Sequence, residues 1–179
     1  MKSEAPSVLR KIFFILLSSA LVLFFLQSCG GGQGTTYNQP KNYDELDQLV
    51  ENRHFEVENQ WTMPLGGSRI DLIGNTNFIR FKGDSVNLFL PYFGVRHSGG
   101  GYGDEGGIKY EGIAEDLKVE KNPDQKKIVL KFGGEQGSEN LDFYVTLFSN
   151  GNTNTSVTSS QRATISYQGH VSAIPEKEQ

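Results

Sequence analysis

Residues 55–61 read Phe-Glu-Val-Glu-Asn-Gln-Trp, and this alternation decides the fold. Alternate side chains in the stretch are Phe, Val, Asn and Trp, and the side chains between them are Glu, Glu and Gln. Successive side chains of a β-strand point to opposite faces, so a period of two predicts a strand with one face in the core and one in water. We expect the strand to end at Met63 and Pro64, because proline removes a backbone donor from the sheet.

Nine more short segments have the composition of strands, and turn residues separate them. Their ranges are 69–73, 77–82, 85–91, 108–115, 117–120, 127–132, 141–149, 155–158 and 163–174. Among the turns, Asn150-Gly151 suits a two-residue type I′ hairpin, and Gly133-Gly134 is read as another tight turn. About eight to ten short strands at this spacing predict a mainly β fold, an antiparallel barrel or sandwich. A parallel α/β sheet is excluded, because the sequence has no crossover helices.

One helix is predicted before the first strand. Asn42 is a suitable N-cap, and Glu45 follows three residues later, as in a capping box. Leu46 and Val50 then fall on one face of the helix, which gives it an apolar side to bury. We expect the helix to end near Asn52 and the β domain to follow at once.

The N-terminal residues resemble a bacterial lipoprotein signal. A basic start precedes an uninterrupted run of apolar and small residues over 12–25, and Leu26-Gln27-Ser28-Cys29 resembles a lipobox. A membrane-spanning helix needs about 20 apolar residues, and the fourteen found here favour a cleaved signal peptide. We therefore expect residues 1–28 to be removed. The alternative is an N-terminal membrane helix that stays in place.

The lipobox implies that Cys29, the single cysteine, receives a diacylglycerol and that fatty acids such as palmitate hold the mature chain at a membrane. Two or more acyl chains anchor a protein stably, whereas one binds only marginally. An outer-membrane destination is expected, because Gly30 and not aspartate follows the cysteine. Residues 30–34 carry no acidic side chain, which favours the periplasmic face over the cell surface.

Residues 29–41 are read as the lipidated cysteine and a flexible tether. The stretch 30–40 is mainly Gly, Thr, Gln and Asn without charge, so it cannot bury enough surface to offset the entropy lost on ordering. We expect a single β domain over residues 42–175, followed by a short solvated tail over residues 176–179.

The charge balance argues against a nucleic-acid partner. The chain has 17 basic and 21 acidic residues; residues 1–28 hold three of the basic and one of the acidic ones, which leaves 14 and 20 and a net charge of −6. Nucleic-acid binders carry a basic patch, and no basic run here is longer than Lys126-Lys127. With its one thiol acylated, the mature chain has no disulfide and no thiolate ligand, and we expect no cofactor.

Residues 99–107 form a glycine-rich stretch that satisfies G-x-G-x-x-G without the context of a dinucleotide site. A strand and not a helix follows it, and its two acidic side chains would repel a phosphate. His97, Asp104 and Glu105 could gather around a cation, but a loop this rich in glycine does not orient ligands, so no metal site is predicted. The same three residues are the only basis for an enzyme. No Gly-x-Ser-x-Gly elbow accompanies them, and no enzyme is predicted.

Two phrases carry a family resemblance: residues 90–94, Leu-Pro-Tyr-Phe-Gly, and residues 162–169, Arg-Ala-Thr-Ile-Ser-Tyr-Gln-Gly. With the helix, the first strand and the lipoprotein signal, they resemble the DUF4251 family of Bacteroidetes lipoproteins over about residues 43–174. The resemblance implies an extracytoplasmic domain with no assigned activity. Read structurally, Pro91 ends a strand, Gly94 permits a bend, and the Tyr-Gln-Gly end of the second phrase forms a kink or bulge in the last strand.

Aromatic side chains around the glycine-rich stretch are the candidate ligand-binding residues. Tyr92, Phe93 and Tyr102 could line an apolar or sugar-binding pocket, and packing in the core is the alternative. We therefore predict a membrane-anchored envelope lipoprotein whose non-catalytic β domain binds a small apolar ligand or a protein partner. The alternatives are a structural or assembly component of the envelope with no ligand, and an enzyme. Asp84-Ser85-Val86 also resembles an O-glycosylation sequon of Bacteroidetes envelope proteins, and a turn entering a strand explains it equally well.

Overall fold

The computed structural model describes residues 38–98 and 106–174. One helix, α2 (Tyr43–Asn52), precedes ten strands. The strands are β1 (His54–Pro64), β2 (Ile70–Asp71), β3 (Phe78–Lys82), β4 (Ser85–Pro91), β5 (Gly107–Ile113), β6 (Glu115–Asn122), β7 (Lys127–Gln136), β8 (Glu139–Phe148), β9 (Asn152–Ser159) and β10 (Ile165–Ala173). The predicted signal, Cys29, the tether up to residue 37 and the tail lie outside the described residues. Within the described ranges, no helix is long and apolar enough to cross a membrane.

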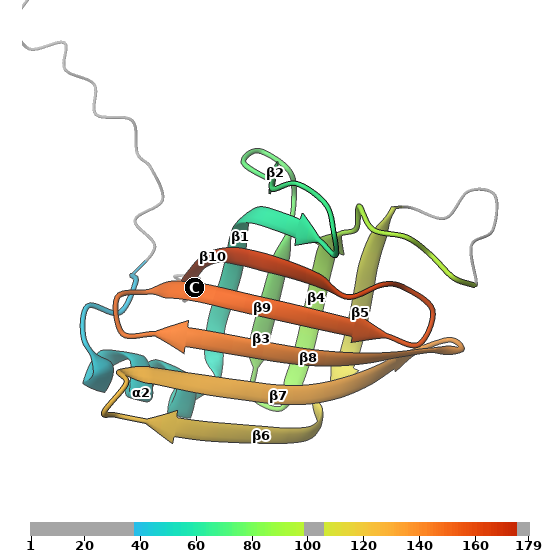
Figure 1. Cartoon of the computed structure of the whole chain (residues 1–179). Coiled ribbons are helices and arrows are strands. Elements are labelled where there is room, and N and C mark those ends of the chain that lie inside the picture. Colours follow the sequence, from blue (N-terminus) through green and yellow to red (C-terminus); the bar gives the residue numbers. More distant parts are fainter. Residues whose placement is uncertain (1–37, 99–105, 175–179) are drawn as a thin grey trace, which may run out of the picture. The chain divides into compact units, whose positions relative to one another are not determined.

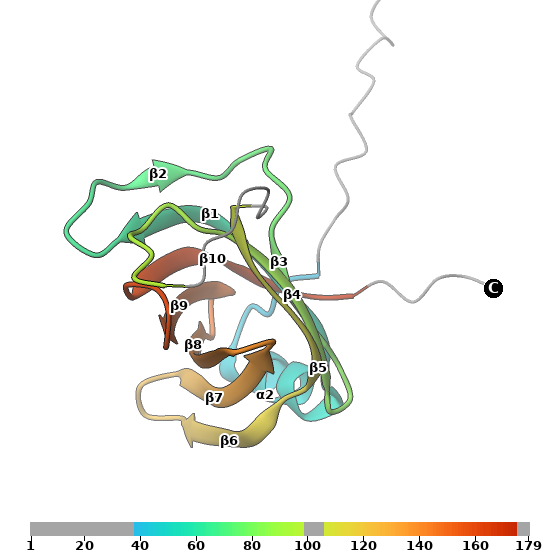
Figure 2. The same cartoon turned by 90° about the vertical axis from the view of Figure 1, so that its right-hand side faces the viewer.

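The strands form one antiparallel sheet in the order β5-β4-β3-β1-β10-β9-β8-β7-β6, and β2 pairs with the end of β1. Figure 1 shows β6 to β9 crossing in front of β1, β3, β4 and β5, and the side view in Figure 2 shows the sheet curling round so that two layers face each other. Only Ala114 separates β5 from β6, the strands at the two ends of the order. The fold is a nearly closed antiparallel barrel, which confirms the predicted mainly β class.

Helix α2 begins and ends as the sequence predicts. The Asn42 side chain accepts a hydrogen bond from the backbone N–H of Glu45 at 2.9 Å, and the Glu45 carboxylate accepts one from the Asn42 amide at 2.8 Å. Arg53 ends the helix in the left-handed conformation, with φ of 46°. Leu46 and Val50 are buried in the core, and Figure 2 shows α2 at one end of the barrel, between the two layers.

A chain of aromatic rings crosses the interior of the barrel. Phe55 of β1 stacks on Phe81 of β3 with ring centroids 4.8 Å apart, and Phe81 meets Phe132 of β7 edge to face at 5.3 Å. Phe132 in turn stacks on Phe143 of β8 at 4.7 Å. Each such contact adds about 0.5–1.5 kcal/mol beyond the burial of its area. These rings link the two layers, so side chains fill the barrel along this line.

Gly133 and Gly134 do not form the turn that the sequence suggested. Both lie inside β7, where they pair with Asp142 and Leu141 of β8. A Cβ atom on Gly134 would lie 2.5 Å from the ring of Tyr110, a residue of β5. The missing side chain therefore lets β5 pack against β7, which is the contact that nearly closes the barrel.

The hairpin between β8 and β9 also differs from the prediction. Its loop has three residues, 149–151, and not two. Gly151 has φ of +81°, whereas Asn150 is not among the residues with positive φ, so the type I′ turn is excluded. The Gly151 N–H donates to the Phe148 carbonyl oxygen at 2.9 Å, which makes a type I turn followed by a left-handed glycine.

The predicted irregularity near Gly169 is present, but the extra residue belongs to β1. Asn59 pairs with Gly169 and Trp61 pairs with Gln168, so Gln60 is a bulge. A Cβ on Gly169 would lie 2.0 Å from the Glu58 carbonyl oxygen, so this close approach of backbones requires glycine.

The bulge reverses which side chains of β1 face the core. Phe55 and Val57 point inward before it, and Thr62, only 1% exposed, does so after it. Trp61 therefore faces outward, and the expectation that it shares the core face with Phe55 is wrong. A bulge re-aims the side chains that follow it, and the alternation of the sequence alone did not show this one.

Candidate functional site

The structure gives the predicted aromatic residues different surroundings. The hydroxyl of Tyr92 lies 2.8 Å from the carbonyl oxygen of Val95 and 2.9 Å from that of Ala163, to which it donates its proton. Phe93 is 50% exposed. Tyr102 lies outside the described residues, so a pocket formed by all three stays a prediction.

Of the three predicted cation ligands, the structure describes one. His97 is described and donates its backbone N–H to the Gln161 carbonyl oxygen at 2.8 Å, while Asp104 and Glu105 lie outside the described residues. Across residues 38–98 and 106–174, no group of three His, Cys, Asp or Glu residues is placed to hold a metal ion.

The two sequence phrases that carry the family resemblance meet at one end of the barrel. The Tyr167 hydroxyl donates to the Pro91 carbonyl oxygen at 2.9 Å, and Arg96 forms a β-bridge with Arg162. The Arg162 guanidinium also lies over the Tyr92 ring, 5.2 Å from its centroid. These residues therefore join the end of β4 to the start of β10.

Arg162 is the centre of this end and forms a buried ion pair. Its Nε donates to Glu139 Oε1 at 2.7 Å and its Nη2 donates to Oε2 at 2.9 Å. Its Nη1 donates to the Gly107 carbonyl oxygen at 2.9 Å. The two side chains are 6% and 7% exposed. Sequence reasoning missed this pair, because nothing in the local sequence around Arg162 or Glu139 identifies the other residue as its partner.

The environment of this end shifts three pKa values. Burial alone would raise the pKa of Glu139, but the hydrogen bonds from Arg162 and Ser159 and the positive charge of Arg162 outweigh it and lower that pKa. Burial raises the pKa of Tyr167 and, against the nearby charge of Arg162, that of Tyr92. Both phenols and the carboxylate are engaged by neighbours, so this cluster builds the barrel end and offers no open group.

An open site lies instead on the outer face of β1, β8, β9 and β10. We call it the Trp61 hollow; its volume is about 330 Å³. Two rows of paired residues cross it from strand to strand, Tyr144-Ser156-Ser166-Met63 and Thr146-Asn154-Gln168-Trp61. Arg69 reaches it from the connection between β1 and β2. The remaining lining residues are Thr62, Thr155 and Tyr167.

Two further hollows continue the Trp61 hollow on either side. One, of about 450 Å³, shares Tyr144 and Ser156 with it, and the other, of about 540 Å³, shares Trp61, Asn154 and Gln168. The three form one depression across the outer face of the sheet.

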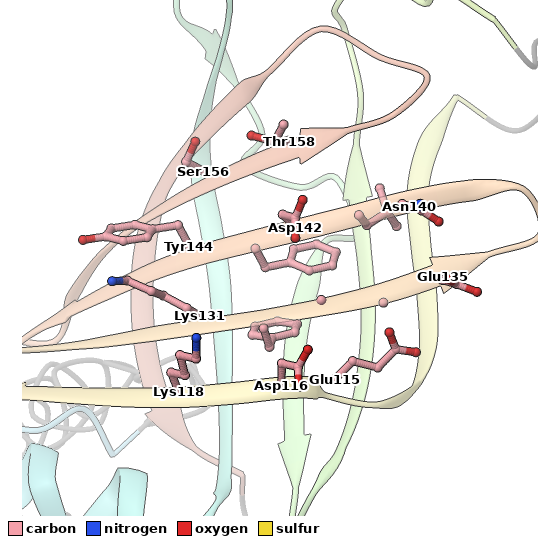
Figure 3. A pocket seen from close by; sticks show the side chains of 15 residues that line it. Glu115, Asp116, Lys118, Lys131, Glu135, Asn140, Asp142, Tyr144, Ser156 and Thr158 are labelled. Atoms are coloured by element: carbon pink, nitrogen blue, oxygen red, sulfur yellow. The ribbon is translucent and has the colours of Figure 1, made fainter.

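Figure 3 shows the first of these neighbours. Lys118 and Lys131 lie beside Tyr144 at one side of it, and Glu115, Asp116 and Glu135 lie towards the other. Lys131 Nζ is 2.6 Å from Glu120 Oε1, so its charge is already paired. The charged side chains thus border the Trp61 hollow on its β7 side.

Arg69 is the one charged residue that lines the Trp61 hollow. Its guanidinium lies over the Trp61 ring, 3.7 Å from the centroid. In the described part of the chain, no carboxylate lies within ion-pair distance of it. Stacking on Trp61 fixes the orientation of the guanidinium plane and leaves the N–H donors at its edge unobstructed by the ring. Arg69 can therefore donate two hydrogen bonds to one carboxylate.

A smaller polar feature lies inside the barrel. The Asn59 amide and the Thr153 and Thr155 hydroxyls are buried without a hydrogen-bond partner in the structure. Asn59 and Thr153 flank Gly169 in the register. Buried polar groups of this kind are commonly satisfied by ordered water, so we read this as a hydration site and not as a candidate binding site.

Comparison with known proteins supports the fold and the family. The chain matches the model of a family described as Domain of unknown function (DUF4251) over residues 37–171, more than half its length. It is similar to the crystal structure, at 1.95 Å resolution, of a DUF4251 family protein from Bacteroides eggerthii DSM 20697: the TM-score is 0.59, the sequences are 18% identical, and the alignment covers 75% of this chain and 89% of that one. At this identity the similarity concerns the fold alone. No curated protein matches the sequence. The chain belongs to the DUF4251 family.

Proposed function

We propose that this chain is a lipid-anchored envelope protein whose β domain is a non-catalytic binding module. Lipidation at Cys29, an outer-membrane location and a periplasm-facing domain rest on the N-terminal sequence, as argued above. The binding surface that we propose is the outer face of β1, β8, β9 and β10, centred on the Trp61 hollow.

The observation that carries the choice of surface is the contrast between the interior and the exterior of the barrel. Phe55, Phe81, Phe132 and Phe143 fill the interior along one continuous line. Three adjoining hollows lie on the outside, and Tyr144 and Met63 are each 45% exposed there. A filled barrel leaves little room for an internal apolar ligand, so a ligand or partner is better accommodated outside.

Pairing through the edge strand β6, as an assembly component would use, has less support. This strand, one of the two at the ends of the order, carries Glu115, Asp116, Lys118, Glu120 and Lys121, all of them charged. Charged side chains along an edge oppose pairing with another chain. Figure 1 shows β6 at the open border of the sheet.

Anchoring is tested by detergent partition of the full chain. Wild type should enter the detergent phase, and Cys29→Ala should move to the aqueous phase or keep an uncleaved signal. Thr35→Ala, in the predicted tether, is the matched control and should behave as wild type. A Cys29→Ala protein that is cleaved and still partitions with detergent would contradict the lipid anchor.

The binding surface is tested by photo-crosslinking in cells. Benzoylphenylalanine at Tyr144 should give an adduct, because this side chain lies in the outer-face depression. Asn87 is exposed on β4 in the opposite layer and serves as the control position. Equal labelling at the two positions, or none at Tyr144, would remove the outer face from the proposal.

A further inference from the structure

We infer that the Trp61 hollow docks a protein segment that places a carboxylate on Arg69 and an apolar side chain between Met63 and Tyr144. This inference rests on the proposed function and adds the chemistry of the partner. It draws on the large side chains of the hollow, the exposed apolar residues on either side of β2, the charge of Arg69, with which no described carboxylate pairs, and the position of the site on the domain.

The large side chains of the hollow are of the types found at the centre of a protein interface. Trp, Tyr, Met and Arg are enriched at such centres, and Lys, Glu, Asp, Ser and Thr are depleted. Trp61, Met63, Arg69 and Tyr144 line the hollow and no Lys, Glu or Asp does, while Ser, Thr, Asn and Gln side chains make up most of the remaining lining. Charged side chains surround it, among them Lys131 in the adjoining hollow. Aromatic side chains with one arginine at the centre and further charges in the adjoining hollow suit a protein partner.

Exposed apolar side chains precede and follow β2, the strand that pairs with Trp61 and Thr62 of the hollow. Leu65, in the connection between β1 and β2, is 76% exposed, and Ile73, just after β2, is 68% exposed. Exposed apolar side chains near a hollow favour an interaction site. A small ligand held in the hollow would leave them in water, whereas a protein segment lying across the hollow would cover them.

Strand β2 and the residues after it are held in place before any partner arrives. Leu72 is 1% exposed, and its N–H donates to the carbonyl oxygen of the bulge residue Gln60 at 2.8 Å. The Asp71 carboxylate accepts from the Ile73 N–H at 2.7 Å, and Thr62 pairs with Ile70. A loop ordered in advance loses less entropy on binding, which favours recognition of a flexible partner segment.

The charge of Arg69 determines what the partner must carry. No described carboxylate pairs with Arg69, and Trp61 holds its guanidinium plane at 3.7 Å. A hydrogen-bonded carboxylate is the natural complement of such a stacked, exposed guanidinium. The other residues that line the hollow are neutral, so one acidic side chain of the partner is enough to balance its charge.

The hollow lies away from the point where the chain enters the domain. Asn38 is bound next to the end of β10, where its carbonyl oxygen accepts from the Ala173 N–H at 3.2 Å, beside the start of β1. Trp61 and Met63 lie near the other end of β1. At about 3.3 Å per residue, roughly 25 Å of strand separates the two places. Asn38, the first described residue, therefore lies well away from the hollow.

The test uses the detergent-solubilised full chain and a library of random displayed peptides. We expect the enriched peptides to share an Asp or Glu next to an apolar residue. The chain has one tryptophan, so a change in its fluorescence on titrating a selected peptide reports on the hollow itself. Arg69→Gln should weaken binding about tenfold, as expected for a lost charge-assisted bidentate contact.

Arg80 provides a matched control. It also stacks on an aromatic ring, Phe78, at 4.0 Å, but its charge is paired with Glu56. Arg80→Gln should bind the selected peptides as wild type does, once thermal unfolding shows that both variants are folded.

Two results would overturn the inference. In the first, no peptide is enriched, or the enriched peptides bind Arg69→Gln as tightly as wild type; a crosslink at Tyr144 would then still support binding on the outer face. In the second, an oligosaccharide containing glucuronic acid changes Trp61 fluorescence in an Arg69-dependent way while peptides do not, and the hollow recognises an acidic sugar instead of a protein.

Discussion

Arg162 and Arg69 each lie over an aromatic ring, but the two regions that hold them differ in what the arginine can still bind. At the barrel end, Arg162 lies 5.2 Å from the Tyr92 centroid, is almost fully buried, and spends its donors on Glu139 and the Gly107 carbonyl. In the outer hollow, Arg69 lies 3.7 Å from the Trp61 centroid and is exposed without a described carboxylate partner. A satisfied charge builds structure, whereas an open one is available for binding.

The largest expected effect comes from removing the buried charge. Arg162→Met leaves the Glu139 carboxylate buried without its partner, which should lower the free energy of unfolding by about 3–5 kcal/mol. Arg69→Gln changes an exposed side chain and should stay within about 0.5 kcal/mol of wild type. Urea unfolding of the full chain measures both. Similar losses of unfolding free energy in the two variants would contradict the distinction between a structural Arg162 and an available Arg69.

A second effect concerns Gly169, which permits the bulge that turns Trp61 outward. Gly169→Ala forces a Cβ against the Glu58 carbonyl and should cost about 1–3 kcal/mol, with a shift in tryptophan emission as Trp61 moves. Gly133→Ala is the control, because its nearest neighbour would lie at 3.6 Å. Unchanged emission and stability in Gly169→Ala would mean that the bulge does not need glycine.

Two tyrosines give a smaller and sharper contrast. The buried Tyr167 hydroxyl bonds to Pro91, so Tyr167→Phe should cost about 1 kcal/mol, the typical net value of one hydrogen bond. Tyr144 is 45% exposed, and Tyr144→Phe should leave the unfolding free energy unchanged. Thermal denaturation of the two variants in parallel decides the point. A loss confined to Tyr144→Phe would reverse the roles of the two regions.

The smallest expected effect is a change in how stability depends on pH. The pKa of Glu139 is lowered in the folded state, so its ionised form contributes stability that is complete above the ordinary value of 4.5 and is lost as the pH falls through the lower folded value. The stability difference between wild type and Glu139→Gln should therefore shrink as the medium is acidified below that value. A difference that grows on acidification would contradict the lowered pKa.

Much of the fold follows from local chemistry that the sequence displays. The Asn42 and Glu45 cap, the period of two in β1 up to Asn59 and the bounds of β4 are local properties, and the structure confirms them. The prediction of a turn at Gly133 and Gly134 was wrong, because glycine is common both in turns and where two strands pack closely. Close packing against Tyr110, a residue of another strand, is the reason for glycine at position 134.

The candidate site was harder to predict for the same reason. Trp61 looked like a core residue because the period of two continues through Gln60, and only the pairing with Gly169 reveals the bulge. Arg69 and Tyr144 are far apart in sequence, and the register of four strands brings them to one hollow. The outward orientation of Trp61 and the proximity of Arg69 and Tyr144 both depend on long-range strand pairing, which no local sequence pattern encodes.

The most direct test of the distinction between the two arginines is a fluorescence titration of Trp61 with an acidic, partly apolar peptide selected from the library. We predict a saturating change in wild type and in Arg80→Gln, and binding about tenfold weaker in Arg69→Gln. A titration in which Arg69→Gln binds as wild type does, or in which Trp61 emission never responds, would contradict the claim that Arg69 is held open for a partner.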